Sequence, residues 1–274
     1  MRALDVLVYV RRYDSDALAV RAALALARRL DVRLHGLYVA PIPPAAFTSP
    51  ETVAVLVHES DRRYHEAQSA GDWWQAQLDT VQAAGDWRVA QADPLDAICH
   101  AARWNDFIVI ERPVQNPDAP LGWGLASRSV FDAGIPLLVV PEGARVDALG
   151  KRVVIAWNSS REAIRAVHGA LPLLRVAEVV HVLDGSPAAG AGGMLHLPAF
   201  DLLDHLRTHG ISAQVETFKP GAEIGVALLA AAHAVEADLI VMGAWGHSRV
   251  AQLVLGGATR HLFQHSDLPL LVAH

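Results

Sequence analysis

A glycine-rich segment near the C-terminal end of the chain carries residue types that can bind a phosphate group. Gly243, Gly246 and Gly256 are separated by two and by nine residues, and Gly257 and Thr259 come next. Glycine has no side chain, so backbone N–H groups at these positions can approach phosphate oxygens closely. A helix that begins near Gly257 would direct its free N–H groups and the positive end of its dipole at the same anion.

The position of this segment in the chain also favours a ligand site. Residues 235–242 (VEADLIVM) predict a buried strand, and the glycine-rich segment begins where that strand ends. Ligands of open α/β sheets bind at the carboxyl ends of the strands. We therefore expect the glycines to lie at the carboxyl edge of a sheet.

The elements that must position these glycines occur twice in the chain. Similar apolar segments begin and end each half: residues 6–10 (VLVYV) and 153–157 (VVIAW), then residues 135–140 (IPLLVV) and 268–273 (LPLLVA). An aspartate, Asp106 or Asp238, precedes a further apolar run in each half. Such self-similarity indicates two copies of one structural unit.

The repeated pattern predicts the fold class. Strands that are apolar throughout and alternate with helices form parallel sheets covered on both faces. We predict an α/β protein with two tandem, open, parallel five-stranded sheets, Rossmann-like, with helices on both faces. Glycines and charges in residues 142–150 place the boundary, giving domains 1–146 and 147–274. Ser159 and Glu162 have the spacing of a capping box at the start of a helix.

The glycine spacing, taken with the repeat, resembles that of the universal stress protein (UspA-like) family in its tandem form. The resemblance covers essentially the whole chain as two copies, and it implies a Rossmann-like nucleotide-binding fold. In the ATP-binding branch, Ser or Thr follows the last glycine. Here Gly257 stands at that position, so one phosphate-binding hydroxyl is missing, although Thr259 lies in the next turn. The implied ligand is ATP or a related adenine nucleotide, with Mg²⁺ as an accompanying ion.

The resemblance also implies roles for other residues of the second half. The residue that closes the first strand approaches the ribose, and here it is Asn158, which forms hydrogen bonds but carries no charge. The end of the second strand recognises adenine, which places Val182 or Leu183 there. His247 follows the second glycine and would lie beside a phosphate.

The first half lacks the glycines and polar residues that the resemblance assigns to a nucleotide site. Trp123 aligns with Gly256, and Glu111, Arg112 and Pro113 replace Gly243, Ala244 and Trp245. Proline removes an N–H donor, and carboxylates such as those of Glu111 and Asp118 repel phosphate. We therefore expect no standard nucleotide site in residues 1–146.

Composition restricts the partners and the compartment. The net charge is −6, and no basic run exceeds three residues, so we expect no nucleic-acid partner. Charged residues interrupt the longest apolar runs well before about 18 residues, so no membrane span is predicted. The apolar run of residues 1–10 has almost no basic leader and is too short for a signal peptide. The single cysteine, Cys99, cannot form an internal disulfide, which favours a reducing cytoplasm.

Other combinations of reactive residues have simpler explanations. The adjacent residues His265, Ser266 and Asp267 are too close in sequence to favour a catalytic triad. His261 and His265 have a zinc-compatible spacing without an evident third ligand, so no metal site is predicted. We expect four tryptophans to be packing residues: Trp73, Trp74, Trp87 and Trp104.

Three functions remain open at this point. The first is a non-enzymatic, nucleotide-responsive protein of the stress response, with no catalytic residues. The second is a slow ATPase, for which the sequence offers neither a Walker lysine after the glycines nor an aspartate beside the loop. The third is a nucleotide-free interaction module or scaffold.

The final strands of the two halves predict an internal assembly. In this family, single-domain members pair through their last strands, here residues 137–140 and 270–273. Both are apolar, and an unpaired edge of that kind is a template for association. We expect an intramolecular pseudo-dimer, with a homodimer of the whole chain as a further assembly.

Overall fold

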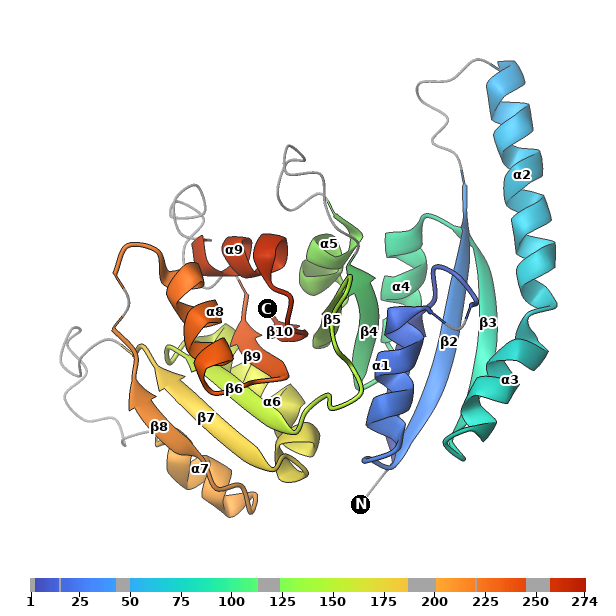
Figure 1. Cartoon of the computed structure of the whole chain (residues 1–274). Coiled ribbons are helices and arrows are strands. Elements are labelled where there is room, and N and C mark those ends of the chain that lie inside the picture. Colours follow the sequence, from blue (N-terminus) through green and yellow to red (C-terminus); the bar gives the residue numbers. More distant parts are fainter. Residues whose placement is uncertain are drawn as a thin grey trace. The chain divides into compact units, whose positions relative to one another are not determined.

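Each half of the chain contains five parallel strands with helices packed against them (Figure 1). The computed structural model describes residues 3–14, 16–42, 50–112, 124–186, 201–219, 221–244 and 257–274. It contains two compact units, Met1–Asp147 and Ala148–His274, here the N-terminal and C-terminal units. The boundary predicted from the sequence lies between residues 146 and 147.

The strands of the N-terminal unit run in the order β3-β2-β1-β4-β5, and all four neighbouring pairs are parallel. The strands are β1 (Leu4–Tyr9), β2 (Val32–Pro41), β3 (Ala84–Ala92), β4 (Phe107–Arg112) and β5 (Leu137–Pro141). The helices are α1 (Leu18–Ala27), α2 (Pro50–Gln68), α3 (Gly71–Asp79), α4 (Pro94–Ala102) and α5 (Leu125–Asp132).

The C-terminal unit repeats this arrangement in the order β10-β9-β6-β7-β8, again with parallel neighbours. Its strands are β6 (Arg152–Trp157), β7 (Val179–Asp184), β8 (Gln214–Thr217), β9 (Leu239–Gly243) and β10 (Leu270–Ala273). Its helices are α6 (Arg161–Arg175), α7 (Leu202–Thr208), α8 (Ile224–Ala234) and α9 (Gly257–His265).

This topology explains why the central strands are apolar on both faces. The connection from β1 to β2 and the connection from β3 to β4 cross the sheet in opposite directions. Because such crossovers are right-handed, α1 and α4 cover opposite faces, and α6 and α8 do the same in the C-terminal unit. Every residue of β4 is buried, as is every residue of β10. The predicted α/β fold class, with Rossmann-like parallel sheets in tandem, is confirmed.

Two equivalent aspartates connect the start of one central strand to its neighbour. The Asp238 carboxylate accepts hydrogen bonds from the backbone N–H groups of Gly150, Lys151 and Arg152 at 2.7, 3.0 and 3.0 Å. Asp106 accepts one from the N–H of Asp5 at 2.8 Å. The aspartates that revealed the repeat in the sequence thus occupy the same place in both units.

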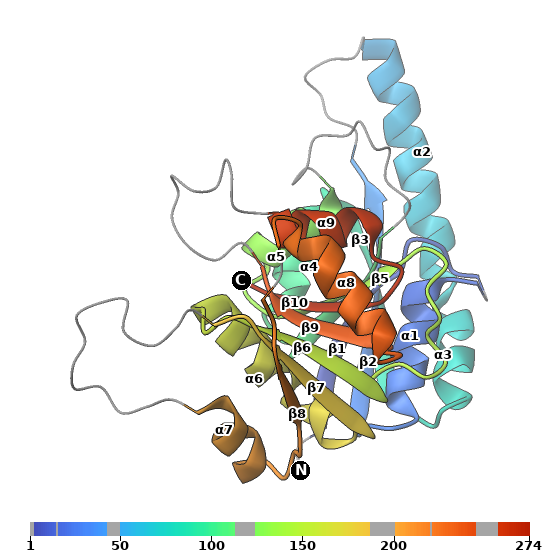
Figure 2. The same cartoon turned by 60° about the vertical axis from the view of Figure 1, so that its left-hand side comes forward.

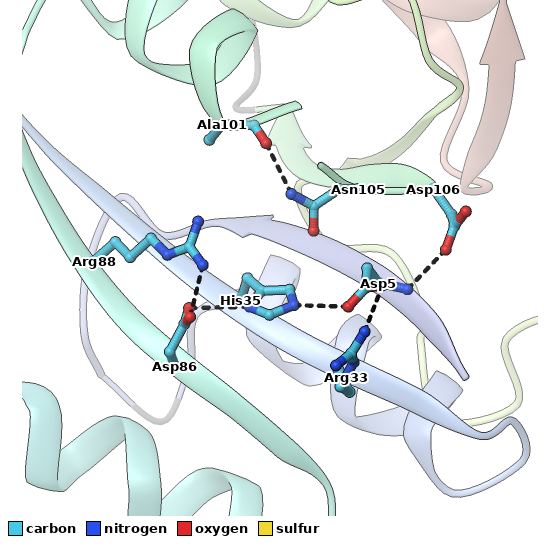
Figure 3. Close-up of polar contacts among 8 residues, drawn as sticks. All are labelled: Asp5, Arg33, His35, Asp86, Arg88, Ala101, Asn105 and Asp106. Carbon is cyan, nitrogen blue, oxygen red and sulfur yellow. Dashed lines mark hydrogen bonds and ion pairs between the residues drawn. The ribbon is translucent and has the colours of Figure 1, made fainter. Parts of the chain in front are cut away.

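A charged cluster crosses the amino-terminal part of the N-terminal sheet (Figure 3). The His35 ring lies between two carboxylates, with Nε2 3.0 Å from Asp5 and Nδ1 3.0 Å from Asp86. Arg33 donates to Asp5, and Arg88 donates to Asp86. The cluster connects β1, β2 and β3 at the edge opposite to the one where ligands of such sheets bind.

The tryptophans of the N-terminal unit do not all pack as predicted. Trp73, Trp74 and Trp87 contact one another, and Trp74 is fully buried. Trp104 is 77% exposed, so its prediction as a packing residue was wrong. It follows α4 in the turn before β4, where the chain lies at the surface.

The units differ most between their second and third strands. The N-terminal unit has two helices there, and Figures 1 and 2 show the 19-residue α2 extending past its own sheet. In the C-terminal unit, the described helix at this place is the seven-residue α7. None of the helices in the described parts of the chain is long and apolar enough to cross a membrane.

Candidate nucleotide site

A cavity of about 670 Å³ opens at the carboxyl edge of the C-terminal sheet. The ends of three strands line it through Trp157 of β6, Leu183 of β7 and Gly243 of β9. The first turns of α8 and α9 form further walls, and Phe218 lines it just after β8. Strand ends and helix N-termini therefore surround one space, as expected for a ligand site of an open α/β sheet.

The cavity brings together four of the predicted site residues: Asn158, Gly243, Gly257 and Thr259. Val182 is buried inside β7 and is not among the lining residues, whereas its neighbour Leu183 is. Successive side chains of a strand point to opposite faces of the sheet, so only one of these two neighbouring residues can point toward the cavity. Three further predicted residues, Gly246, His247 and Gly256, lie outside the described residues.

The loop after β6 is held by its own side chains. Asn158 Oδ1 accepts a hydrogen bond from the N–H of Ser160 at 3.1 Å. Ser159 has a φ of +60°, a conformation unusual for a residue with a side chain, and its Oγ lies 2.7 Å from Oγ of Ser186. These contacts connect the loops that follow β6 and β7.

The predicted capping box at α6 was wrong by one residue. Ser160 is the N-cap, and its Oγ accepts a hydrogen bond from the N–H of Ala163 at 3.1 Å. Ser159 cannot take this role because its left-handed backbone directs the hydroxyl to Ser186. Glu162 instead lies buried in the first turn of α6.

Gly243 lies at a close approach between β9 and α6. A Cβ atom at this position would lie 2.4 Å from the backbone nitrogen of Ala163 and 2.8 Å from Cβ of Glu162. Neither distance is compatible with a side chain. The glycine is therefore required by helix packing, in addition to any approach of its backbone to a ligand.

Gly257 has the opposite environment. It is the first residue of α9, and no described atom lies within 4 Å of the Cβ that a side chain would add. As the first residue of the α-helix α9, it lies in a backbone conformation that other residues also adopt. Nearby Thr259 is buried and lines the same cavity. The first turn of α9 thus lines the cavity with backbone N–H groups that have no partner within the helix.

Two ionisable residues of the cavity were missing from the sequence prediction. Glu223 precedes α8, and His261 lies in the second turn of α9. Burial and the nearby His265 hold the pKa of His261 below its usual value, against the opposite effect of Glu223. The spacing of His261 after Gly257 was the available signal, because residues four apart share a helix face.

The corresponding place in the N-terminal unit is built differently. β4 ends in Glu111 and Arg112, which are 9% and 5% exposed, where β9 ends in Gly243. Burial lowers the pKa of Arg112. Two buried charged side chains therefore lie at the strand end that, in the C-terminal unit, is a glycine lining the cavity. Trp123 and Asp118 lie outside the described residues.

The histidine and serine combinations noted in the sequence have structural roles. Ser266 Oγ donates to the carbonyl of Leu268 at 2.8 Å, and Asp267 pairs with His233 at 3.0 Å. The rings of His261 and His265 lie 4.6 Å apart. Across the described ranges, no group of three His, Cys, Asp or Glu side chains could hold a metal ion.

Comparison with known proteins agrees with this architecture. Residues 150–274 match the model of the universal stress protein family. No curated protein matches the chain.

Solved structures extend the likeness of fold to the N-terminal unit. A universal stress protein from Archaeoglobus fulgidus is 17% identical, with a TM-score of 0.74, and the match covers 100% of this chain and 99% of that one. A putative universal stress protein from Pseudomonas aeruginosa is 15% identical, with a TM-score of 0.60, covering 99% and 93%. Residues 150–274 are therefore a universal stress protein domain, and the chain as a whole has the fold of this family.

Proposed function

We propose that the chain binds one adenine nucleotide in its C-terminal unit and acts as a nucleotide-responsive, non-enzymatic protein of the stress response in the cytoplasm. The observation that carries this proposal is the cavity at the carboxyl edge of the sheet, which the first turn of α9 lines on one side. A helix N-terminus that faces an open space is suited to a phosphate group.

The residues present fit a nucleotide in size and in chemistry. A volume of about 670 Å³ lies within the range of about 300–1,000 Å³ that small-molecule sites occupy. Leu183, Phe218 and Ile224 supply apolar surface for a base, and Asn158 supplies a polar group for a sugar. Among the described atoms, none would obstruct a phosphate beside Gly257 in the first turn of α9. When bound, the nucleotide would supply the anionic group that these N–H donors recognise.

ATP itself, with Mg²⁺, is the finer form of the proposal. Its support is the sequence spacing of Gly243, Gly246 and Gly256 together with the cavity that Gly243 lines. The roles assigned to Val182 and His247 remain proposals of the same kind. Slow hydrolysis would appear as phosphate release above the background of a variant that cannot bind.

The two units would then differ in role. We propose that residues 1–146 keep the packing surface without a standard nucleotide site, and that residues 147–274 keep the ligand. Pairing of residues 137–140 with 270–273 as a pseudo-dimer belongs to the same proposal, as does a homodimer of the chain.

The direct test is the identity of any small molecule carried by the protein. Freshly purified full-length protein is denatured, and the released molecules are identified by mass spectrometry. An adenine nucleotide at near one equivalent supports the proposal. Protein that releases none, and that also fails to bind added ATP, ADP and AMP by calorimetry, would favour the nucleotide-free scaffold.

A further inference from the structure

His261 is held in place by close contact between α8 and α9. A Cβ atom added to Gly225 of α8 would lie 2.5 Å from Cβ of His261 and 3.2 Å from Cα of Ala258. No side chain fits between the helices at this point. The backbone of α8 therefore limits where the imidazole of His261 can lie, and the ring is among the groups that line the cavity.

The position of His261 on α9 directs its ring toward the start of the helix. Gly257, Ala258 and His261 share one face, because residues three and four apart are neighbours on a helix. Helical side chains also tilt toward the N-terminus, so that of His261 leans over the preceding turn. That turn carries the free N–H groups that would bind an anion.

The charges around His261 make its protonation state important. Among the described lining residues, Glu223 and His261 are the two with acidic or basic side chains. With His261 neutral, Glu223 leaves a net negative charge in the wall of the cavity. With His261 protonated, the two charges cancel, and a cation faces the proposed phosphate position.

Other titratable groups near His261 act on the same equilibrium. His265 lies one turn further along α9, with ring centroids 4.6 Å apart, and disfavours a second positive charge. Burial acts in the same direction, while Glu223 opposes both, and the pKa of His261 falls below its usual value. The free protein near neutral pH therefore holds His261 mainly as the neutral imidazole.

We propose that His261 binds the phosphate of the nucleotide as an imidazolium ion, so that nucleotide binding takes up a proton and strengthens as the pH falls. This rests on the proposed nucleotide site. A bound phosphate raises the proton affinity of His261, and by linkage protonation raises the affinity for the phosphate. Adenosine, which has no phosphate, gains nothing from the proton.

The test is calorimetric titration of the full chain with ADP and with adenosine between about pH 5.5 and about pH 8. Two buffers of different ionisation enthalpy reveal the protons taken up. The variants are His261→Gln, which cannot be charged, and His233→Gln, a matched control on an exposed histidine that pairs with Asp267. The terminal phosphate of ADP itself titrates near about pH 6, so each affinity is expressed as the ratio of the wild-type value to the variant value at the same pH.

We expect the ratio of the wild-type ADP affinity to that of His261→Gln to rise about five- to tenfold from the upper to the lower pH. Wild type and His233→Gln should take up protons on binding ADP, and His261→Gln should not. For adenosine, the ratio of wild-type affinity to His261→Gln affinity should not change with pH. Equal ADP profiles for wild type and a folded His261→Gln would overturn the inference and leave the nucleotide site intact. Absence of binding by both ligands would overturn the proposed function itself.

A second variant keeps the inference testable if His261→Gln does not fold. Glu223→Gln removes the carboxylate that favours the protonated His261, so the rise in ADP affinity and the proton uptake should begin at a lower pH than in wild type, with no change for adenosine. A pH profile of ADP binding that this variant leaves unchanged, with no proton uptake by wild type, would contradict the inference.

Discussion

A Cβ atom on Gly243 would lie 2.4 Å from the backbone nitrogen of Ala163, so the end of β9 and the first turn of α6 meet without space for a side chain. This contact joins the strand that precedes the glycine-rich segment to a helix on one face of the sheet. The first glycine of the segment is thus fixed by the fold, whereas no described atom lies within 4 Å of a Cβ placed on Gly257, which also lines the cavity.

Gly243→Ala should destabilise the protein. The added methyl group would force α6 away from β9, and overpacking of this kind costs about 1–3 kcal/mol. Urea unfolding followed by far-UV circular dichroism measures the effect. Gly257→Ala is the matched control and should leave the free energy of unfolding unchanged or raise it by up to about 1 kcal/mol. Equal effects of both substitutions would show that the contact at Gly243 is relaxed at little cost.

Gly257→Ser should strengthen ATP binding. It restores the hydroxyl that the family places after its last glycine, and Gly257 lies in a helix, whose backbone conformation a serine also adopts. A hydrogen bond to a charged group contributes about 1.5–3 kcal/mol at best, so a gain of several-fold is expected. Calorimetric titration decides, and equal or weaker binding by the serine variant would show that this hydroxyl does not limit affinity.

Asp238→Ala should lower the free energy of unfolding of the protein by more than the loss of a surface charge does. Its carboxylate accepts hydrogen bonds from three successive backbone N–H groups at the start of β6, and removal should cost about 2 kcal/mol or more. Glu178→Gln is the control, because its exposed ion pair with Lys151 contributes about 1 kcal/mol at most. Thermal and urea unfolding of the two variants should differ clearly; a loss no larger than that of the control would contradict the account of Asp238.

The ionised Asp86 should stabilise the folded state at pH values above the pKa that this group has in the unfolded chain, and this stabilisation should be lost in acid. Burial raises the pKa of Asp86, but hydrogen bonds from Arg88 and His35 outweigh this and hold the pKa below its usual value. A carboxylate with a lowered pKa stabilises the folded state above its unfolded pKa, near about 4, and less as the pH falls further.

The comparison is between wild type and Asp86→Asn, melted from about pH 6 to about pH 3. The difference in Tm between them should shrink as the pH falls, by a few degrees because Asp86 is partly exposed. Trp87 beside it gives a fluorescence signal for this part of the sheet. A Tm difference that stays constant over this range would show that Asp86 does not carry the acid dependence.

The sequence predicted the features that depend on repetition and on apolar runs. The parallel strands followed from segments such as residues 153–157, which are too apolar for a half-exposed sheet. Asp106 and Asp238 were visible as paired signals because both units use a carboxylate at the same strand junction.

Features that depend on exact geometry escaped the sequence. The choice of Ser160 over Ser159 as the helix cap depends on the left-handed backbone of one residue. The choice between Val182 and Leu183 depends on which strand face borders the cavity. Glu223 and His261 line one cavity because α8 and α9 pack closely at Gly225, a contact between segments separated in sequence.

The most direct test of the central claim is the number of nucleotides bound per chain, measured by equilibrium dialysis of the full-length protein with labelled ATP. Two variants at one open position sharpen it: Gly257→Glu places a negative charge at the proposed phosphate position, and Gly257→Gln adds similar bulk without charge. A carboxylate near a helix N-terminus favours the helix, so the first variant should stay folded. The account predicts one equivalent for wild type, with affinity reduced about tenfold or more, or about 1.4 kcal/mol, by Gly257→Glu relative to Gly257→Gln. Two equivalents per chain, no binding, or equal affinities of the two variants would contradict it.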